Sequence, residues 1–296
     1  MPVISCVFAP SLDTPAHIEL AERLGYRRAW CYDSPAVYAD PWMVLALAAG
    51  RTRAIGLGPA SLVPSLRHPV VTAAALATLV RLAKRAPGSG IDDFWRQADR
   101  ASDWSSAAPY GLRGATRALA LTGAYRRGEP ACDVIDELAF DDEASAARCL
   151  ADPAFGRAWA SPLLDPASVA CLVVEEHVAK PGPVPASFVK NYELVTKRPD
   201  MDRAEFDRYW AQVHGPLAAT IPTIRRYVQA HLSPGTREAG TAPYDGLAIT
   251  WFDDVVAMRA GAATEAYAKT RADEANFLAG ELPFVITTER TTFPRA

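Results

Sequence analysis

The chain has 296 residues, of which half are hydrophobic and 22% are charged, a composition typical of globular proteins. Its formal net charge of -3 includes no basic excess, which argues against a sequence-independent grip on nucleic acid or on an anionic membrane. Small molecules or proteins are therefore the expected partners.

The 5 cysteines are scattered singly and never form a CxxC pair. This spacing indicates buried thiols in a reducing cytoplasm, and neither a disulfide framework nor a metal site is expected. The N-terminus lacks the positive charge of a signal peptide, and the longest apolar run, 70–80, is too short to span a bilayer. We therefore expect a soluble, cytoplasmic protein that makes no membrane contact.

Residues 1–79 alternate short apolar strands with helices. Strands are predicted over 3–8, 28–32 and 54–58. One helix begins at Thr14-Pro15 and ends at Gly25, and a second covers 41–49. This β-α-β-α-β order predicts parallel strand pairing with right-handed crossovers.

From residue 80 the order of the elements changes to β-α-β-β-α-β, and this order occurs twice in succession. The predicted strands are 80–84, 115–121, 134–140 and 170–178 in the first pass, and 190–197, 226–232, 246–252 and 284–291 in the second. The helices begin at 92 and 141, and then at 202 and 253. A Pro/Gly-rich segment, 179–185, is expected to be a stiff linker between the passes.

Several residues recur with one constant offset. Phe94 and Arg113 return 112 residues later as Phe206 and Arg225, and the Phe140-Asp-Asp step returns at Phe252. This offset predicts two repeats, 80–183 and 184–296.

The predicted fold class is α+β: two β-α-β-β-α-β repeats that follow a partial βα segment. A lone four-stranded sheet with helices on one face leaves its other face bare. We therefore expect the two repeats to form an intrachain pseudo-dimeric α/β barrel with a cleft between the sheets.

Strand alternation sorts the polar residues of the second repeat. Tyr227, Gln229 and His231 share one face of their strand, and Thr287 and Glu289 share one face of another. Because such a face is costly to bury dry against helices, it is assigned to the cleft. The first repeat has Ala115, Arg117 and Leu119 at the positions equivalent to the first three, so the first repeat is expected to be structural and the second functional.

His214 is predicted at the end of the first helix of the second repeat, beside a Gly-Pro stop. An imidazole there can reach a cleft and titrate near neutrality, as proton transfer requires. The alternative is a histidine that satisfies the last carbonyls of its helix. The equivalent residue of the first repeat is Ser102.

A set of motifs in the second repeat points to a known family. The motifs are Lys197-Arg198, Glu205-Phe206, Tyr209-Trp210, His214-Gly-Pro-Leu217, Ile224-Arg225-Arg226-Tyr227-Val228-Gln229, Asp245-Gly246, Trp251-Phe252-Asp253-Asp254 and Asp273-Glu274. Together they resemble the EthD family, named for ethyl tert-butyl ether degradation, over most of 186–296. The resemblance implies ferredoxin-like proteins that dimerise into barrels, with polyketide dehydratases, decarboxylases and cyclases among their relatives. Residues 80–180 resemble the same family without the His-Gly-Pro-Leu step.

The resemblance implies a role for His214 as the catalytic acid/base, with Arg225 steadying negative charge. The predicted substrate-binding residues are Trp210, Tyr227, Gln229, His231 and Tyr192. The expected reaction is a dehydration, decarboxylation or cyclisation of a small apolar or aromatic compound, without a cofactor. The alternative is a ligand-binding or accessory protein that catalyses nothing, and a homo-oligomer is compatible with either.

Residues 1–79 resemble a different family. The motifs are Ala21-Glu22-Arg-Leu-Gly-Tyr26, Tyr32-Asp33-Ser34-Pro35, Asp40-Pro41-Trp42, Ile55-Gly-Leu-Gly58 and Arg67-His68-Pro69. They look like the opening of a luciferase-like flavin or deazaflavin oxidoreductase, whose fold is a (β/α)8 barrel. Because about three strands of that barrel are present, an accessory layer is the favoured interpretation. A flavin or deazaflavin is expected only if this segment is functional.

Overall fold

The computed structural model describes residues 4–32, 39–61, 77–98, 104–184, 187–240 and 242–293. The chain divides into two compact units, Met1–Thr72 and Ala73–Ala296. The boundary predicted between residues 79 and 80 falls inside strand β4 (Ala77–Ala83). Each unit is described by itself.

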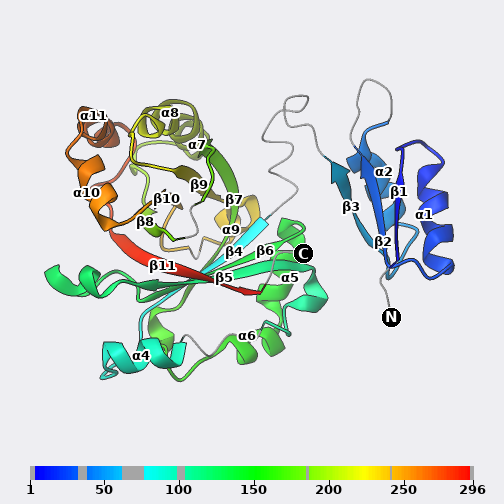
Figure 1. The fold of residues 1–296 in the computed structure, drawn as a ribbon, viewed down its shortest axis with the longest axis horizontal. Coiled ribbons are helices and arrows are strands. Elements are labelled where there is room, and N and C mark those ends of the chain that lie inside the picture. The colour runs from blue at the N-terminus through cyan, green and yellow to red at the C-terminus, as the bar shows by residue number, and fades with distance from the viewer. Residues whose placement is uncertain are drawn as a thin grey trace. The chain divides into compact units, whose positions relative to one another are not determined.

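The described part of the first unit is a parallel sheet with strand order β1-β2-β3, accompanied by two helices (Figure 1). The elements are β1 (Ser5–Phe8), α1 (Thr14–Arg23), β2 (Arg28–Tyr32), α2 (Pro41–Ala49) and β3 (Gly56–Ser61). Ile18, Cys31 and Val44 are in a small apolar core between the helices and the sheet. The predicted parallel pairing is confirmed, whereas the Arg67-His68-Pro69 motif lies outside the described residues.

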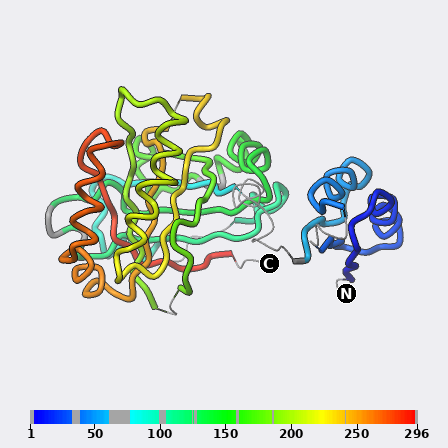
Figure 2. Tube along the Cα trace, turned by 90° about the horizontal axis from the view of Figure 1, so that it is seen from above, coloured from blue at the N-terminus to red at the C-terminus, as the bar shows by residue number. Residues whose placement is uncertain are grey.

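The second unit is a closed barrel with strand order β10-β8-β11-β5-β6-β4-β7-β9, in which every neighbouring pair is antiparallel. After β4, its strands are β5 (Leu112–Ala120), β6 (Val134–Phe140), β7 (Ala170–Lys180), β8 (Val189–Val195), β9 (Arg226–Leu232), β10 (Gly246–Phe252) and β11 (Phe284–Phe293). The pairs β5–β11 and β7–β9 join the earlier half of the barrel to the later half. In Figure 2 the trace of this unit runs from the cyan β4 to the red β11.

Helices accompany both halves of the barrel. They are α4 (Ile91–Ala98), α5 (Glu143–Ala151), α6 (Pro153–Trp159), α7 (Arg203–Tyr209), α8 (Gly215–Ala219), α9 (Pro234–Ala239), α10 (Val255–Ala262) and α11 (Glu265–Asp273). A π-helical turn, η5 (Trp210–His214), joins α7 to α8, and 3-10 turns are η2 (Ala108–Tyr110), η3 (Thr122–Arg127), η4 (Pro166–Ser168) and η6 (Glu274–Asn276). Asp202 caps α7, the helix predicted to begin at residue 202, because its carboxylate accepts a 2.8 Å hydrogen bond from the N–H of Glu205. No helix in the described segments is both long and apolar enough to cross a membrane.

The two halves keep the offset seen in the sequence. Strands β4 and β8 begin and end 112 residues apart, and so do β6 and β10. Helices α5 and α10 begin 112 residues apart. The predicted mixture of strands and helices is therefore confirmed, with its elements close to the predicted positions.

One residue in two along each strand points into the barrel. Val80, Ile135, Leu172, Val228 and Ile249 contribute to an apolar cluster drawn from all eight strands, which fills the interior. A second cluster, with Phe206, Trp210 and Phe277 among its members, lies between the outer face of the later sheet and its helices. The barrel therefore has an inner core and separate outer layers.

Candidate active site between sheet and helices

The polar face of β9 lies on the outside of the barrel. Tyr227 packs in the outer apolar cluster, while Val228 and Ala230 belong to the inner core. The assignment of Tyr227, Gln229 and His231 to a cleft between the sheets is therefore wrong. The helical layer can bury them because it supplies hydrogen-bond partners. On β11 the predicted direction is right, since Glu289 bonds to Lys190, whose ammonium lies over the ring of the inner-core residue Tyr192.

The π-helical turn shapes the helix that covers this face. The Trp210 carbonyl accepts from the N–H of Gly215 and also, at 2.8 Å, from Nε2 of Gln229. A Cβ atom at Gly215 would lie 2.9 Å from that same Nε2, so any larger residue there would displace the Gln229 amide. A Cβ atom at Gly246 would similarly meet the Trp210 ring at 2.7 Å. Single π turns inside helices are frequent at functional sites.

His214 ends this turn and forms a dyad with Asp273. Its Nδ1 lies 2.9 Å from Oδ2 of Asp273, and the Tyr209 hydroxyl donates to the other carboxylate oxygen at 2.7 Å. The imidazole is buried and lies 4.6 Å from the Phe277 ring centroid. Burial lowers the pKa of His214, although the hydrogen bond and charge of Asp273 oppose that effect.

The tautomer of His214 follows from the protonation state of the Asp273 carboxylate. Burial alone would raise the pKa of Asp273, but hydrogen bonds from Tyr209, His214 and Asn276 bring it below its usual value. An ionised Asp273 accepts a hydrogen bond from Nδ1–H of a neutral imidazole. Nε2 of His214 is then the nitrogen that can take up a proton.

Two carboxyl groups complete the cluster. Burial raises the pKa of Glu274 to about 7, the charge of Arg271 lowers it and that of Glu193 raises it. Burial also raises the pKa of Glu193 on β8, again opposed by Arg271. Nη1 of Arg271 lies 2.9 Å from Oε1 of Glu274, and its charge also acts on His214. A neutral imidazole and a carboxyl that holds its proton near neutrality therefore lie in one electrostatic cluster.

Unused acceptors lie on the same outer face. Oδ1 of Asn191 on β8 and Oε1 of Gln229 on β9 are buried, and neither has a hydrogen-bond partner among the described residues. A buried acceptor left without a donor costs about 1–3 kcal/mol. Donor groups of a bound compound would remove that cost.

A second histidine–carboxylate pair involves Asp207, which lies about two helical turns before His214. Nδ1 of His231 is 3.0 Å from Oδ1 of Asp207, and the Trp210 ring lies 4.3 Å from the His231 ring. Nε2 of His231 is buried, and within the described chain it has no hydrogen-bond partner. Asp207 also pairs with Arg237 at 3.1 Å.

The structure separates two of the predicted site residues from the others. Tyr192 is fully buried inside the barrel beside Lys190, whose ammonium lies 2.5 Å from carboxylate oxygens of both Glu137 and Glu289. Arg225 is an exposed surface residue that is paired with Asp253 at 2.5 Å. The structure does not bring it together with His214, because its guanidinium is bound to a surface carboxylate.

The remaining predicted residues, His214, Trp210, Tyr227, Gln229 and His231, come together in the helical layer. Sequence reasoning missed Asp273, Glu274, Glu193, Arg271 and Asp207 as site residues. Asp273-Glu274 were already part of the EthD-like motifs, which was a usable signal. Within the described ranges, no group of three or more His, Cys, Asp or Glu residues is placed to hold a metal ion.

Comparisons with known proteins match two segments of the chain. Residues 198–281 match the EthD domain, and residues 12–84 match the luciferase-like monooxygenase domain. The chain therefore carries an EthD domain and a luciferase-like segment, as the motifs indicated. A search of curated proteins finds no match.

Solved structures give more distant similarities. A candidate monooxygenase from Lactobacillus acidophilus NCFM is 13% identical, with a TM-score of 0.45 over 74% of this chain and 96% of that protein. An EthD family protein from Bacillus halodurans is 22% identical, with a TM-score of 0.30 over 35% of this chain and 99% of its own. A dimeric ferredoxin-like protein of unknown function from Bacteroides fragilis is 16% identical, with a TM-score of 0.27 over 35% of this chain and 95% of its own.

Proposed function

We propose that the EthD-like unit catalyses cofactor-free proton transfer on a small apolar or aromatic compound, such as a dehydration, decarboxylation or cyclisation. The observation that carries the proposal is the dyad of His214 and Asp273, 2.9 Å apart, next to the Arg271–Glu274 ion pair at 2.9 Å. The pKa of His214 is lowered and that of Glu274 is raised to about 7. Acid/base catalysis near neutral pH requires one group that can accept a proton, here His214, and one that can donate a proton, here Glu274.

In a dehydration, Nε2 of His214 would remove a proton from the carbon beside a carbonyl group. Glu274 would protonate the departing hydroxyl, so that water leaves as the carbon–carbon double bond forms. Asp273 would stabilise the imidazolium, and Arg271 takes the charge-steadying role first assigned to Arg225. Asn191 and Gln229 would accept hydrogen bonds from substrate donors.

We also propose that the barrel is an internal pseudo-dimer of two EthD-like repeats. The equal spacing of β4 and β8, and of β6 and β10, supports this proposal. The second repeat then corresponds to the matched EthD domain, and the first is a degenerate copy without the His-Gly-Pro-Leu step.

The test uses an aromatic β-hydroxy ketone, 4-hydroxy-4-phenylbutan-2-one, whose dehydration product absorbs in the near ultraviolet. The variant His214→Ala should lose about 10²–10⁴-fold in rate, the usual contribution of a general base. His17→Ala, which removes an exposed histidine of the first unit, is the matched control and should leave the rate unchanged. A rate that survives His214→Ala would remove the mechanism.

The pH profile gives an independent check. Activity should fall at acidic pH, as His214 is protonated through its lowered pKa, and at alkaline pH, as Glu274 loses its proton near pH 7. In Glu274→Gln the alkaline limb should disappear.

A second candidate function rests on the luciferase-like match at 12–84. If this segment acts in redox chemistry, the purified protein should carry flavin or deazaflavin, seen as visible absorbance and as fluorescence released on denaturation. A colourless preparation that binds neither riboflavin phosphate nor a deazaflavin would leave it as an accessory layer.

A further inference from the structure

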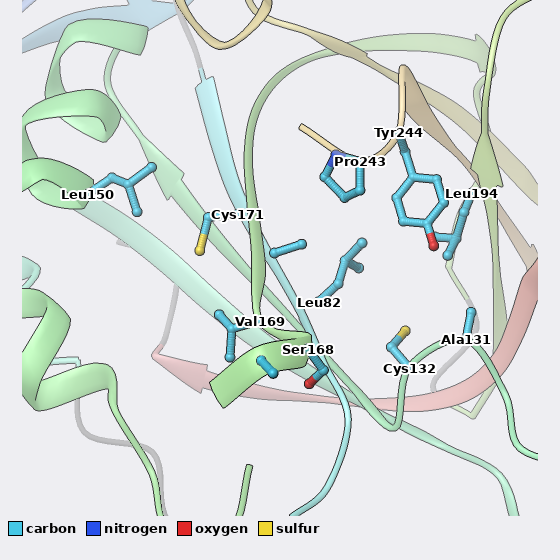
Figure 3. Close-up of a pocket in the computed structure, with 12 residues that line it drawn as sticks. Leu82, Ala131, Cys132, Leu150, Ser168, Val169, Cys171, Leu194, Pro243 and Tyr244 are labelled. Atoms are coloured by element: carbon cyan, nitrogen blue, oxygen red, sulfur yellow. The ribbon is translucent and has the colours of Figure 1, made fainter. Parts of the chain in front are cut away.

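One mouth of the barrel carries a pocket of about 530 Å³ (Figure 3). Both halves of the barrel contribute to it. Its lining residues are Leu82, Ala131, Cys132, Leu150, Ala167, Ser168, Val169, Ala170, Cys171, Leu194, Pro243 and Tyr244. It shares no residue with the His214 cluster, and its volume is in the usual range for small-molecule sites, about 300–1,000 Å³.

The lining carries no Asp, Glu, Lys, Arg or His side chain. Burial raises the pKa of the Cys132 thiol to about 12 and that of the Cys171 thiol to about 11, so both stay protonated. Burial likewise raises the pKa of the Tyr244 hydroxyl. The pocket is therefore electrically neutral at physiological pH, and a charged ligand would lose hydration there without gaining a counter-ion.

The hydrogen-bonding capacity of the side chains is narrow. The Ser168 hydroxyl is already used, because it donates to the Asp165 carbonyl at 2.7 Å and accepts from the N–H of Lys84 at 2.8 Å. The Tyr244 hydroxyl has no hydrogen-bond partner in the part of the chain that the structure describes. Beside the weak S–H donors of the two cysteines, it offers one strong free donor, which matches a ligand with one acceptor.

Some apolar side chains of the pocket lining are exposed to solvent. Leu150 is 37% exposed and Val169 is 40% exposed, although both belong to a concave surface. Covering such surface with an apolar ligand is favourable by about 25 cal/mol per Å². The lining residues Leu82 and Leu194 are buried members of the inner core.

We propose that this pocket is a binding site, separate from the His214 cluster, for a small neutral compound with an apolar or aromatic body and one hydrogen-bond acceptor. Tyr244 donates to the acceptor, and the leucine, valine and thiol groups enclose the body.

The experiment compares two naphthalenes of nearly equal shape by equilibrium dialysis against the full chain. 1-Acetylnaphthalene has an acceptor, and 1-ethylnaphthalene has none. The acetyl compound should bind about tenfold more tightly, and Tyr244→Phe should abolish the difference while leaving ethyl binding unchanged. The anion 1-naphthoate should bind at least about tenfold more weakly than the acetyl compound.

A pair of matched variants tests the location. Ala167 is an exposed pocket residue, so Ala167→Trp should fill the pocket and reduce binding of both naphthalenes by at least about tenfold. Ala154→Trp places the same side chain at an exposed position outside the lining and should bind like wild type. Binding that survives Ala167→Trp in a protein with a native circular dichroism spectrum would overturn the site, and so would an acetyl preference that survives Tyr244→Phe. Binding in His214→Ala should equal that of wild type, which separates this proposal from the catalytic one.

Discussion

The outer faces of the two barrel halves differ at three equivalent positions. In the earlier half, Asp136 lies between two arginines, 2.5 Å from Nη2 of Arg81 and 2.6 Å from Nε of Arg117. All three side chains are buried. The positions 112 residues later hold Glu193, Gln229 and Ala248.

This difference shows that the same barrel framework can carry fully paired polar groups on one half and polar groups with unused hydrogen-bonding capacity on the other half. Asp136 hydrogen-bonds to both arginines, so each buried guanidinium group of the earlier half has a carboxylate partner. In the later half Ala248 supplies no counter-charge. Glu193 keeps a raised pKa and Gln229 keeps an unused acceptor, which are features of a binding or catalytic surface.

The largest effect should come from Asp136→Ala. This change removes the one carboxylate that bonds to both buried guanidinium groups, so it should lower the free energy of unfolding by about 3–5 kcal/mol. Urea denaturation followed by circular dichroism measures the loss. The counterpart change, Glu193→Gln, should cost little or stabilise, and equal losses at the two positions would break the comparison.

The next effect is a pH dependence of stability that originates partly in Glu274. The pKa of Glu274 is about 7 in the folded chain, whereas its ordinary value, which applies to the unfolded chain, is 4.5. Between these two pH values the folded state therefore binds more protons than the unfolded state. This contribution to stability is complete below about pH 4.5 and is lost as the pH rises through about 7. Glu137, with a pKa of about 7, acts in the same direction.

The urea midpoint should therefore fall between pH 5 and pH 7.5, and Glu274→Gln should reduce that fall. A pH dependence identical to wild type in the variant would show that Glu274 titrates normally. Asp136→Asn, placed in the earlier half, is the comparison variant: it should lower the midpoint at both pH values without flattening the slope.

The smallest effect concerns a feature that the halves share. Asp142 and Asp254 cap α5 and α10 at equivalent positions, and each carboxylate accepts a hydrogen bond from a backbone N–H, at 2.6 Å and 2.7 Å. Replacing either by alanine should cost about 1 kcal/mol. Unequal losses in thermal unfolding would mean that the helices do not contribute alike.

The sequence predicted most elements because their apolar periodicity is local. The strands at 226–232, 246–252 and 134–140 match β9, β10 and β6 residue for residue. Strand alternation separates two faces but does not say which face is inside, and this is why the direction of Tyr227, Gln229 and His231 was reversed. The partners that make their burial acceptable, such as the Trp210 carbonyl, become visible only in three dimensions.

The site itself was predicted in part. His214 was identified from its position beside Gly215 and from the motif, but its partner Asp273 is 59 residues away and cannot be derived from local spacing. The π-helical turn was also missed, because no residue pattern announces an inserted turn inside an amphipathic helix.

Lys190 forms ion pairs with carboxylates from both halves of the barrel. Its ammonium binds Glu137 of the earlier half and Glu289 of the later half, while the position equivalent to Glu137 in the later half is Ile249. Two copies of the later half that closed on each other would each bury this lysine with one carboxylate missing. The charge balance around Lys190 therefore depends on both halves of the barrel.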